Sequence, residues 1–187
     1  MNAAPLTDHN AHRLIAAIAK YDSNAAYDGV FAEVHTRLRD AGEAGKADIA
    51  IIAFWKRIRL DATWVGNLLS MPEEDIRRAT RSAFGQAGDR EALSELAVLP
   101  GFRTWGAMAT ALLCAYDPLR WPVMDRNAFE GLRQLGQRVD GKAPTYFRDV
   151  RQLRDQLVRY RPGTTVREID KALFIIGREI LDRRGRA

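Results

Sequence analysis

The stretch VLPGFRTWGAMATALL, residues 98–113, predicts two helices joined by a tight turn. Pro100 ends the first helix because it lacks an N–H donor, and Gly101 tolerates backbone angles that other residues avoid. We expect the second helix to begin near Thr104, with its free N–H groups facing outward as a favourable position for a phosphate. Ala107 is small enough for the two helix backbones to approach each other closely where they cross.

Asp125 follows in the sequence WPVMDRNAF, residues 121–129, directly before another expected helix. An aspartate at this position caps the free N–H groups of the helix and interacts favourably with its dipole, which is worth about 1 kcal/mol. A capped carboxylate is also held rigidly, as a catalytic acid has to be. Both interpretations are open at this stage, and they are compatible with each other.

Helical periodicity continues along almost the whole chain, and no stretch alternates apolar and polar residues long enough to predict a strand. The segment 47–59 is apolar on nearly every side up to Lys56, so we expect it to be the most buried helix. The fold class is therefore all-α, with about ten helices in a single domain over residues 1–187. The further expected helices lie at residues 7–21, 25–42, 63–70, 71–84, 89–99, 125–136, 146–160 and 165–184.

The composition narrows the possible classes of protein. Apolar residues make up 47% of the 187 residues and charged residues 28%, which is typical of a globular domain. The single cysteine, Cys114, excludes an internal disulfide and a four-cysteine metal or iron–sulfur site. His9, His12 and His35 lack a convincing partner ligand, so no metal site is expected. The chain has no apolar run long enough to span a membrane and no signal peptide pattern, so we expect a cytoplasmic protein.

Positive charge is concentrated toward the C-terminus. Residues 120–187 hold 16 Lys and Arg against 9 Asp and Glu, whereas residues 1–119 hold 13 against 15. A basic third of this kind is consistent with a polyanionic partner, although a solvated basic surface gives the same pattern. The charge therefore supports nucleic-acid binding without establishing it.

The segment 93–136 resembles the helix-hairpin-helix DNA glycosylases, a superfamily of base-excision enzymes. The hairpin motif is matched by Leu99, Pro100, Gly101, Phe102 and Ala107, and the following Pro-hydrophobic-Asp motif by Pro122, Val123, Met124, Asp125 and Asn127, with Leu132 continuing its helix. The chain departs from the family at two positions. Arg103 replaces the second hairpin glycine, and Trp105 stands where the lyase-active branches carry a lysine.

The resemblance implies a hairpin at residues 93–116 and a monofunctional glycosylase, because without the lysine no Schiff base with the sugar forms at that position. Asp125 would then be the catalytic acid, stabilising the oxocarbenium-like transition state. The implied DNA contacts are Leu99, Gly101, Phe102, Arg103, Thr104 and Arg126. The extruded base would be bound by aromatic residues, with Trp105 the first candidate and Phe54, Trp55 and Trp121 as others. Each of these four aromatic residues fits an ordinary core position as well.

The implied partner is double-stranded DNA carrying a damaged base, bound by a monomer away from membranes, at the nucleoid if the source is bacterial. No iron–sulfur cluster is expected, and the resemblance leaves room for a structural monovalent ion at the hairpin. The resemblance does not determine which base is excised. Trp105 resembles the branch for alkylated purines, PVMDRN is nearer to the adenine-mispair enzymes, and 8-oxoguanine and uracil are further options. Two other functions also stay open: a non-catalytic helix-hairpin-helix DNA-binding module, and an unrelated helical interaction protein.

Overall fold

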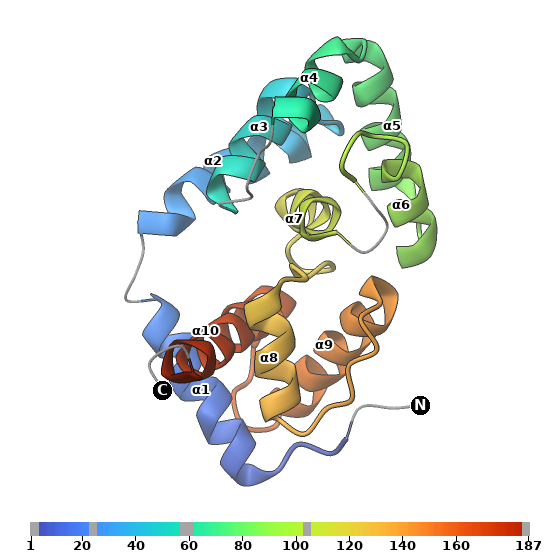
Figure 1. The fold of residues 1–187 in the computed structure, drawn as a ribbon. Helices are drawn as coiled ribbons and strands as arrows, with labels where there is room; N and C mark the ends of the chain where they lie inside the picture. The colour runs from blue at the N-terminus through green and yellow to red at the C-terminus, as the bar shows by residue number, and fades with distance from the viewer. Residues whose placement is uncertain (1–3, 23–25, 57–61, 103–105, 185–187) are drawn as a thin grey trace. The chain divides into compact units, whose positions relative to one another are not determined.

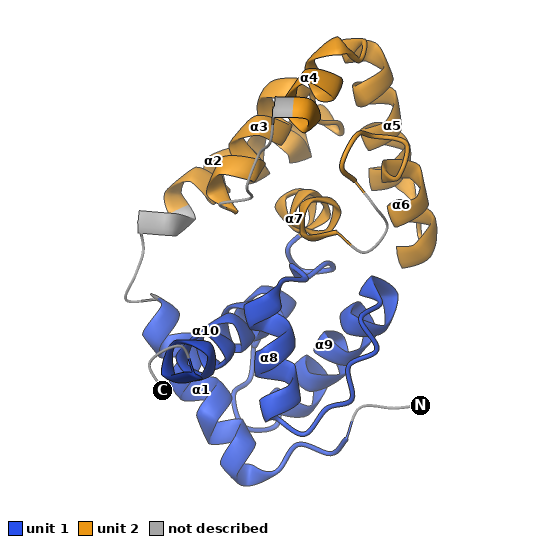
Figure 2. Cartoon of the chain, in the orientation of Figure 1, with its two compact units in different colours: residues 1–25, 118–187 blue, residues 26–117 orange. Residues whose placement is uncertain are grey.

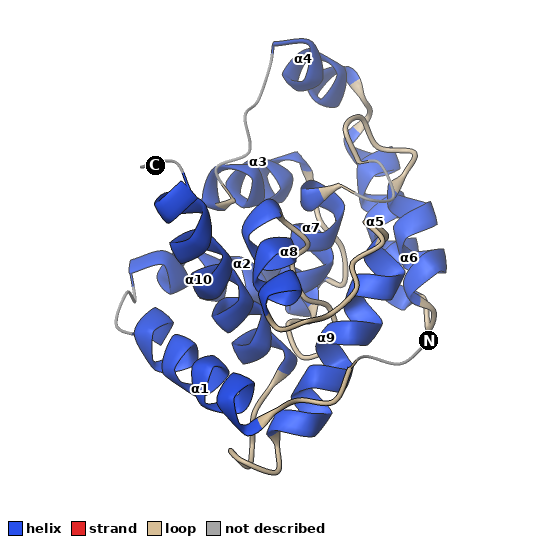
Figure 3. Ribbon diagram, turned by 60° about the horizontal axis from the view of Figure 1, so that its bottom comes forward, coloured by secondary structure: helices blue, strands red, loops and turns tan. Residues whose placement is uncertain are grey.

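The computed structural model describes residues 4–22, 26–56, 62–102 and 106–184. These residues form ten helices and no strand, so the expected all-α class is confirmed for the described part of the chain (Figures 1 and 3). The chain divides into two compact units, shown in Figure 2. Unit 1 comprises residues 1–25 and 118–187, and unit 2 comprises residues 26–117.

Unit 1 is built around its last helix. It contains α1 (Asp8–Asp22), α8 (Arg126–Gln134), α9 (Ala143–Leu157) and α10 (Val166–Arg184). The long helix α10 contacts each of the other three helices. The N-terminal and C-terminal parts of the chain therefore form one core, although the whole of unit 2 separates them in sequence.

Unit 2 is built around α7 (Ala107–Tyr116), which packs against α2 (Ala26–Ala41), α3 (Lys46–Trp55) and α6 (Asp89–Leu96). The eight consecutive residues Met108–Ala115 of α7 are all buried. The remaining helices of the unit are α4 (Ala62–Ser70) and α5 (Glu73–Gly85), and α5 packs on α6. The core of unit 2 thus surrounds a short helix whose residues are nearly all apolar.

Local sequence signals explain where several helices begin. Pro72 is the N-cap of α5, and three acidic residues occupy the first turn, where they interact favourably with the helix dipole. At the start of α10, the Glu168 side chain accepts a hydrogen bond from the Thr165 N–H at 2.8 Å, and the Thr165 hydroxyl accepts one from the Glu168 N–H at 3.2 Å. This reciprocal pair is a capping box.

The expected ranking of buried helices is wrong. The segment 47–59 was expected to be the most buried, but α3 ends at Trp55, and Phe54 near its end is 79% exposed. Residues 57–59 lie outside the described part of the chain. The most buried helix of unit 2 is instead α7, because several helices pack around it. Among the described residues, no helix is long and apolar enough to cross a membrane.

Candidate functional site

The Leu-Pro-Gly stretch forms the predicted turn between α6 and α7 in unit 2. The Phe102 N–H donates to the Leu99 carbonyl at 3.1 Å, and Gly101 has a φ of +76°. Proline at the second position and a glycine of positive φ at the third are typical of a type II turn. The expectation that Gly101 adopts angles closed to other residues is therefore confirmed.

Trp64 of α4 packs against this turn and forms a hydrogen bond with it. Its indole Nε1–H donates to the Pro100 carbonyl at 2.8 Å. A Cβ built on Gly101 would lie only 1.8 Å from the same Nε1. Gly101 is thus required twice, once for its positive φ and once because an indole packs against its Cα. The predicted monovalent ion at the hairpin stays a prediction, and a cation bound at the Pro100 carbonyl would have to share it with this indole.

The residues of the turn that were predicted to contact DNA differ in their solvent exposure. Leu99 and Phe102 are buried in unit 2, at 2% and 0% exposure, so neither residue is open to a partner in this structure. Gly101 is exposed. Arg103, Thr104 and Trp105 lie outside the described residues. Helix α7 begins at Ala107 with Gly106 as its N-cap, three residues after the expected start.

Asp125 is the N-cap of α8 in unit 1, as one of the two interpretations of the sequence predicted. Its backbone is extended, with a φ of −133° and a ψ of 174°, and its Oδ1 accepts a hydrogen bond from the Ala128 N–H at 2.8 Å. The residue is half-buried. Arg126, the first residue of α8, is exposed beside it. The cap bond fixes the rotamer of the carboxylate relative to the helix.

The helix that carries Asp125 is locked to α10 by two glycines. A Cβ on Gly177 of α10 would lie 1.8 Å from the Asn127 carbonyl oxygen, and a Cβ on Gly131 of α8 would lie 2.1 Å from the Leu173 carbonyl oxygen. The two helices therefore cross backbone against backbone, with no side chain between them at these positions. Since Asn127 is only two residues from Asp125, the crossing fixes the end of α8 that bears the carboxylate.

The other predicted pocket residues lie in different surroundings. Phe54 is exposed, whereas Trp55 is buried and packs on Phe31 with ring centroids 4.9 Å apart. Trp121 is fully buried, and the Arg120 guanidinium lies 3.9 Å from its ring centroid. Phe54 and Trp55 belong to unit 2, and Trp121 belongs to unit 1. Trp55 and Trp121 thus occupy core positions, which the sequence also allowed.

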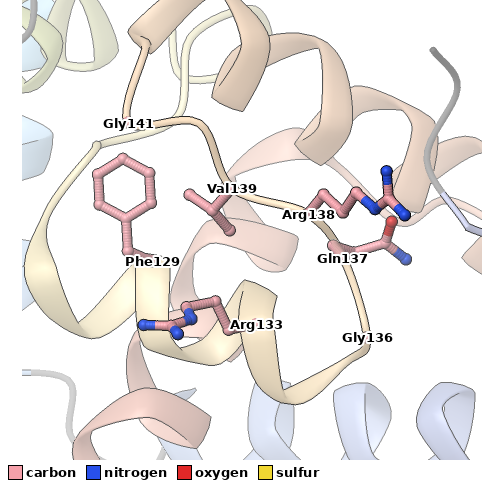
Figure 4. Close-up of a pocket in the computed structure, with 7 residues that line it drawn as sticks. All are labelled: Phe129, Arg133, Gly136, Gln137, Arg138, Val139 and Gly141. Atoms are coloured by element: carbon pink, nitrogen blue, oxygen red, sulfur yellow. The ribbon is translucent and has the colours of Figure 1, made fainter.

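An open hollow of about 680 Å³ lies in unit 1 beside the C-terminal half of α8 (Figure 4). Its lining residues come from α8 and the loop that follows it. They are Phe129, Arg133, Gly136, Gln137, Arg138, Val139 and Gly141. The Gln137 amide is already engaged, because its Oε1 accepts from the Ala4 N–H at 2.7 Å and its Nε2 donates to the Ala4 carbonyl at 3.1 Å. Asp125 is not among the residues that line this hollow, since it caps the other end of α8.

The sequence analysis did not predict two contacts, one made by Trp64 with the turn and one made by Asp170 with the segment before Asp125. Trp64 lies 36 residues before Pro100, and nothing in the sequence around it links its indole to the turn. Asp170 of α10 is buried, at 4% exposure, and its carboxylate contacts the segment that leads to Asp125. Its position four residues after Val166 and three before Leu173, on the apolar face of the helix, was the available signal.

Comparison with protein-family models, curated proteins and solved structures finds no match to this chain.

Proposed function

We propose that this chain is a monofunctional DNA base-excision glycosylase of the helix-hairpin-helix type, acting on a damaged or modified base in double-stranded DNA. The observation that carries the proposal is that the Asp125 carboxylate is held in a fixed position. A half-buried carboxylate stands at the N-terminus of α8, and α8 is fixed to α10 by the glycine crossing. The turn with Gly101 at positive φ supports the same proposal from unit 2.

The proposed reaction is hydrolysis of the N-glycosidic bond. Asp125 stabilises the positive charge that develops on the sugar as the bond from C1′ to the base nitrogen breaks. The bonding electron pair leaves with the base, which takes up a proton from solvent. Water forms the new bond to C1′ and gives one proton to the carboxylate, which then releases it to solvent, so the products are the free base and an abasic sugar. A fixed carboxylate is effective here because it pays no reorganisation cost as the charge develops.

The products distinguish this proposal from a bifunctional enzyme. Trp105 stands where a lyase carries its lysine, and an indole forms no Schiff base with the sugar. The abasic site should therefore remain intact after base release. Strand cleavage is expected only after treatment with alkali.

DNA contact in this proposal comes from the exposed Gly101 of the turn and from exposed cations of unit 1. Arg126 is exposed directly after Asp125, and the basic third of the sequence, residues 120–187, falls in unit 1. Contacts between arginine and phosphate release counterions, so the affinity for duplex DNA should fall steeply with salt.

The test uses labelled duplexes carrying an alkylated purine, 8-oxoguanine, uracil, hypoxanthine or mispaired adenine. The wild type should release one of these bases, with strand cleavage only after alkali. Asp125→Asn and Asp125→Ser are the informative variants, because both residues cap a helix about as well as aspartate but carry no charge. We expect both variants to keep the wild-type melting temperature and to lose base release by about 100-fold or more.

A non-catalytic DNA-binding module is the second candidate. The bond from the Ala128 N–H to Asp125 favours it, because capping alone explains an aspartate at this position. This candidate predicts salt-dependent duplex binding that is equal in the wild type and in Asp125→Asn, with no base released from any duplex. Absence of salt-dependent binding would instead favour an unrelated helical interaction protein.

A further inference from the structure

Asp170 is a buried carboxylate in α10 that contacts the segment preceding Asp125. Its Oδ1 accepts a hydrogen bond from the Val123 N–H at 3.1 Å. We propose that Asp170 is a positioning residue for Asp125, acting through this bond to Val123 rather than by touching the DNA. The inference rests on the proposed function for its effect on catalysis, while the contact itself can be tested without activity.

The segment from Trp121 to Asp125 depends on outside partners because it is not helical. The four residues Trp121–Met124 are buried and belong to no helix or strand, so the regular hydrogen bonds of such an element do not hold them. A buried N–H group is costly unless it donates to an acceptor, so the acceptor determines where the backbone lies. Val123 is two residues before Asp125. The Asp170 carboxylate therefore fixes the path by which the chain enters α8.

Asp170 is itself held from two further directions. The Tyr146 hydroxyl of α9 donates to Oδ1 at 3.3 Å, and the Arg167 Nη1 contacts Oδ2 at 2.6 Å. Tyr146 is 1% exposed, and the Arg167 side chain is 12% exposed. The carboxylate thus joins α9, α10 and the segment 121–125 in the interior of unit 1. Because it is shielded from water, its position is set by these partners.

Asp170→Asn is the variant that tests this arrangement. An asparagine is nearly isosteric but has only one oxygen, and its NH₂ group is a donor. If the oxygen turns toward Arg167, the NH₂ group faces the Val123 N–H, and the bond to the segment is lost. If it turns toward Val123, two donors face each other at Arg167. Either orientation disturbs the junction while leaving the volume of the side chain unchanged.

Asp149 of α9 provides a matched control within unit 1. It is also 4% exposed, and its Oδ1 accepts from Arg148, with the Nη2 at 2.7 Å. Within the described residues, its hydrogen bonds go to Arg148 and not to the segment 121–125. Asp149→Asn therefore removes an equally buried, ion-paired charge without changing the approach to Asp125.

The activity arm measures single-turnover base excision and duplex affinity for the wild type and both variants. We expect Asp170→Asn to slow excision about 10-fold to 100-fold, because a small displacement of a catalytic group is costly, while duplex affinity changes less than about twofold. Asp149→Asn should slow excision less than about twofold. Equal slowing in both variants, or unchanged excision in Asp170→Asn, would overturn the proposal. Should Asp170→Asn not fold, Tyr146→Phe removes only one donor to the carboxylate and should slow excision about threefold, and an unchanged rate would count against the proposal.

The second arm does not depend on activity and uses amide hydrogen exchange of the full chain. The Val123 amide should exchange at least about 10-fold faster in Asp170→Asn than in Asp149→Asn. Equal exchange would contradict the positioning role even if excision is slowed. If the wild type releases no base from any duplex, the proposed function fails, and the exchange of Val123 still decides whether Asp170 holds the segment that leads to Asp125.

Discussion

Close packing depends on glycine in both units, but for different physical reasons. In unit 2, Gly101 is needed because its φ is +76° and an indole packs against it. In unit 1, Gly131 and Gly177 lie inside helices, and each is needed because the backbone of another helix occupies the place of a Cβ. The first requirement is largely local to the chain, and the second belongs to the packing of two helices. Substitutions at the two places should therefore destabilise the protein for different reasons.

The largest effect is expected at the helix crossing. Gly177→Ala places a methyl group 1.8 Å from the Asn127 carbonyl oxygen, which is backbone and cannot turn aside. We expect a loss of about 3 kcal/mol in the free energy of unfolding, measured by urea denaturation, because α8 has to move away from α10.

Gly66→Ala in α4 is the matched control, because a Cβ there meets nothing within 4 Å. Alanine favours a helix more than glycine does, so this control should gain about 0.5–1 kcal/mol. A Gly177→Ala protein as stable as the wild type would show that the two helices do not need to touch through their backbones.

At the turn, Gly101→Ala should cost about 2 kcal/mol, composed of backbone strain at positive φ and collision with Trp64. The two parts separate in a Trp64→Leu background. There the collision is gone, and the same substitution should cost only about 1 kcal/mol in urea denaturation. An equal cost in both backgrounds would mean that the indole yields freely, so that only the φ of Gly101 matters.

The smallest expected effect is a change of stability with pH. Low pH should leave the contacts of Gly101 and of the helix crossing unchanged, because they contain no titratable group. Burial of Glu168 raises its pKa, but hydrogen bonds from Thr165 and the Arg161 guanidinium outweigh this effect and hold the pKa below its ordinary value. A lowered folded-state pKa gives stability that is present above the unfolded value, about 4.3, and is lost as the pH falls through the folded one.

Glu168→Gln should therefore be less stable than the wild type by about 0.5–1 kcal/mol at pH 7, and the difference should close below about pH 4. Thermal denaturation at several pH values measures it, with Glu33→Gln, an exposed position of α2, as the control for loss of one charge. A difference that stays constant from pH 7 to pH 3 would exclude the carboxylate as its source. The cost of Gly177→Ala should not vary over the same range.

The sequence predicted those features that a short stretch of chain determines by itself. The all-helical class, the Leu-Pro-Gly turn and the capping position of Asp125 follow from residues that act on their own or adjacent backbone. The glycine crossing and the bond from Val123 to Asp170 depend on which helices meet. Val123 and Asp170 are 47 residues apart, and neither residue type indicates the other.

The end of α3 also shows that the sequence does not predict which side of a helix is buried. Phe54 and Trp55 are adjacent aromatic residues, yet the first is 79% exposed and the second only 9%. Successive residues point about 100° apart around a helix, so one faces solvent when the other packs on Phe31. A segment that is apolar on nearly every side up to Lys56 does not show which side has a neighbour.

The division of unit 1 into two chain segments has a consequence for how the protein is made. Unit 2 is continuous, so residues 26–117 can begin to fold as soon as they leave the ribosome. Helix α1 is synthesised before unit 2 and its partner α10 after it, and the ion pair between Lys20 and Glu179 spans 159 positions. During synthesis the apolar face of α1 therefore stays without the partner that covers it while residues 23–165 are made. Helix α8, which Asp125 caps, is made after unit 2, and it too lacks its main partner until α10 has been synthesised.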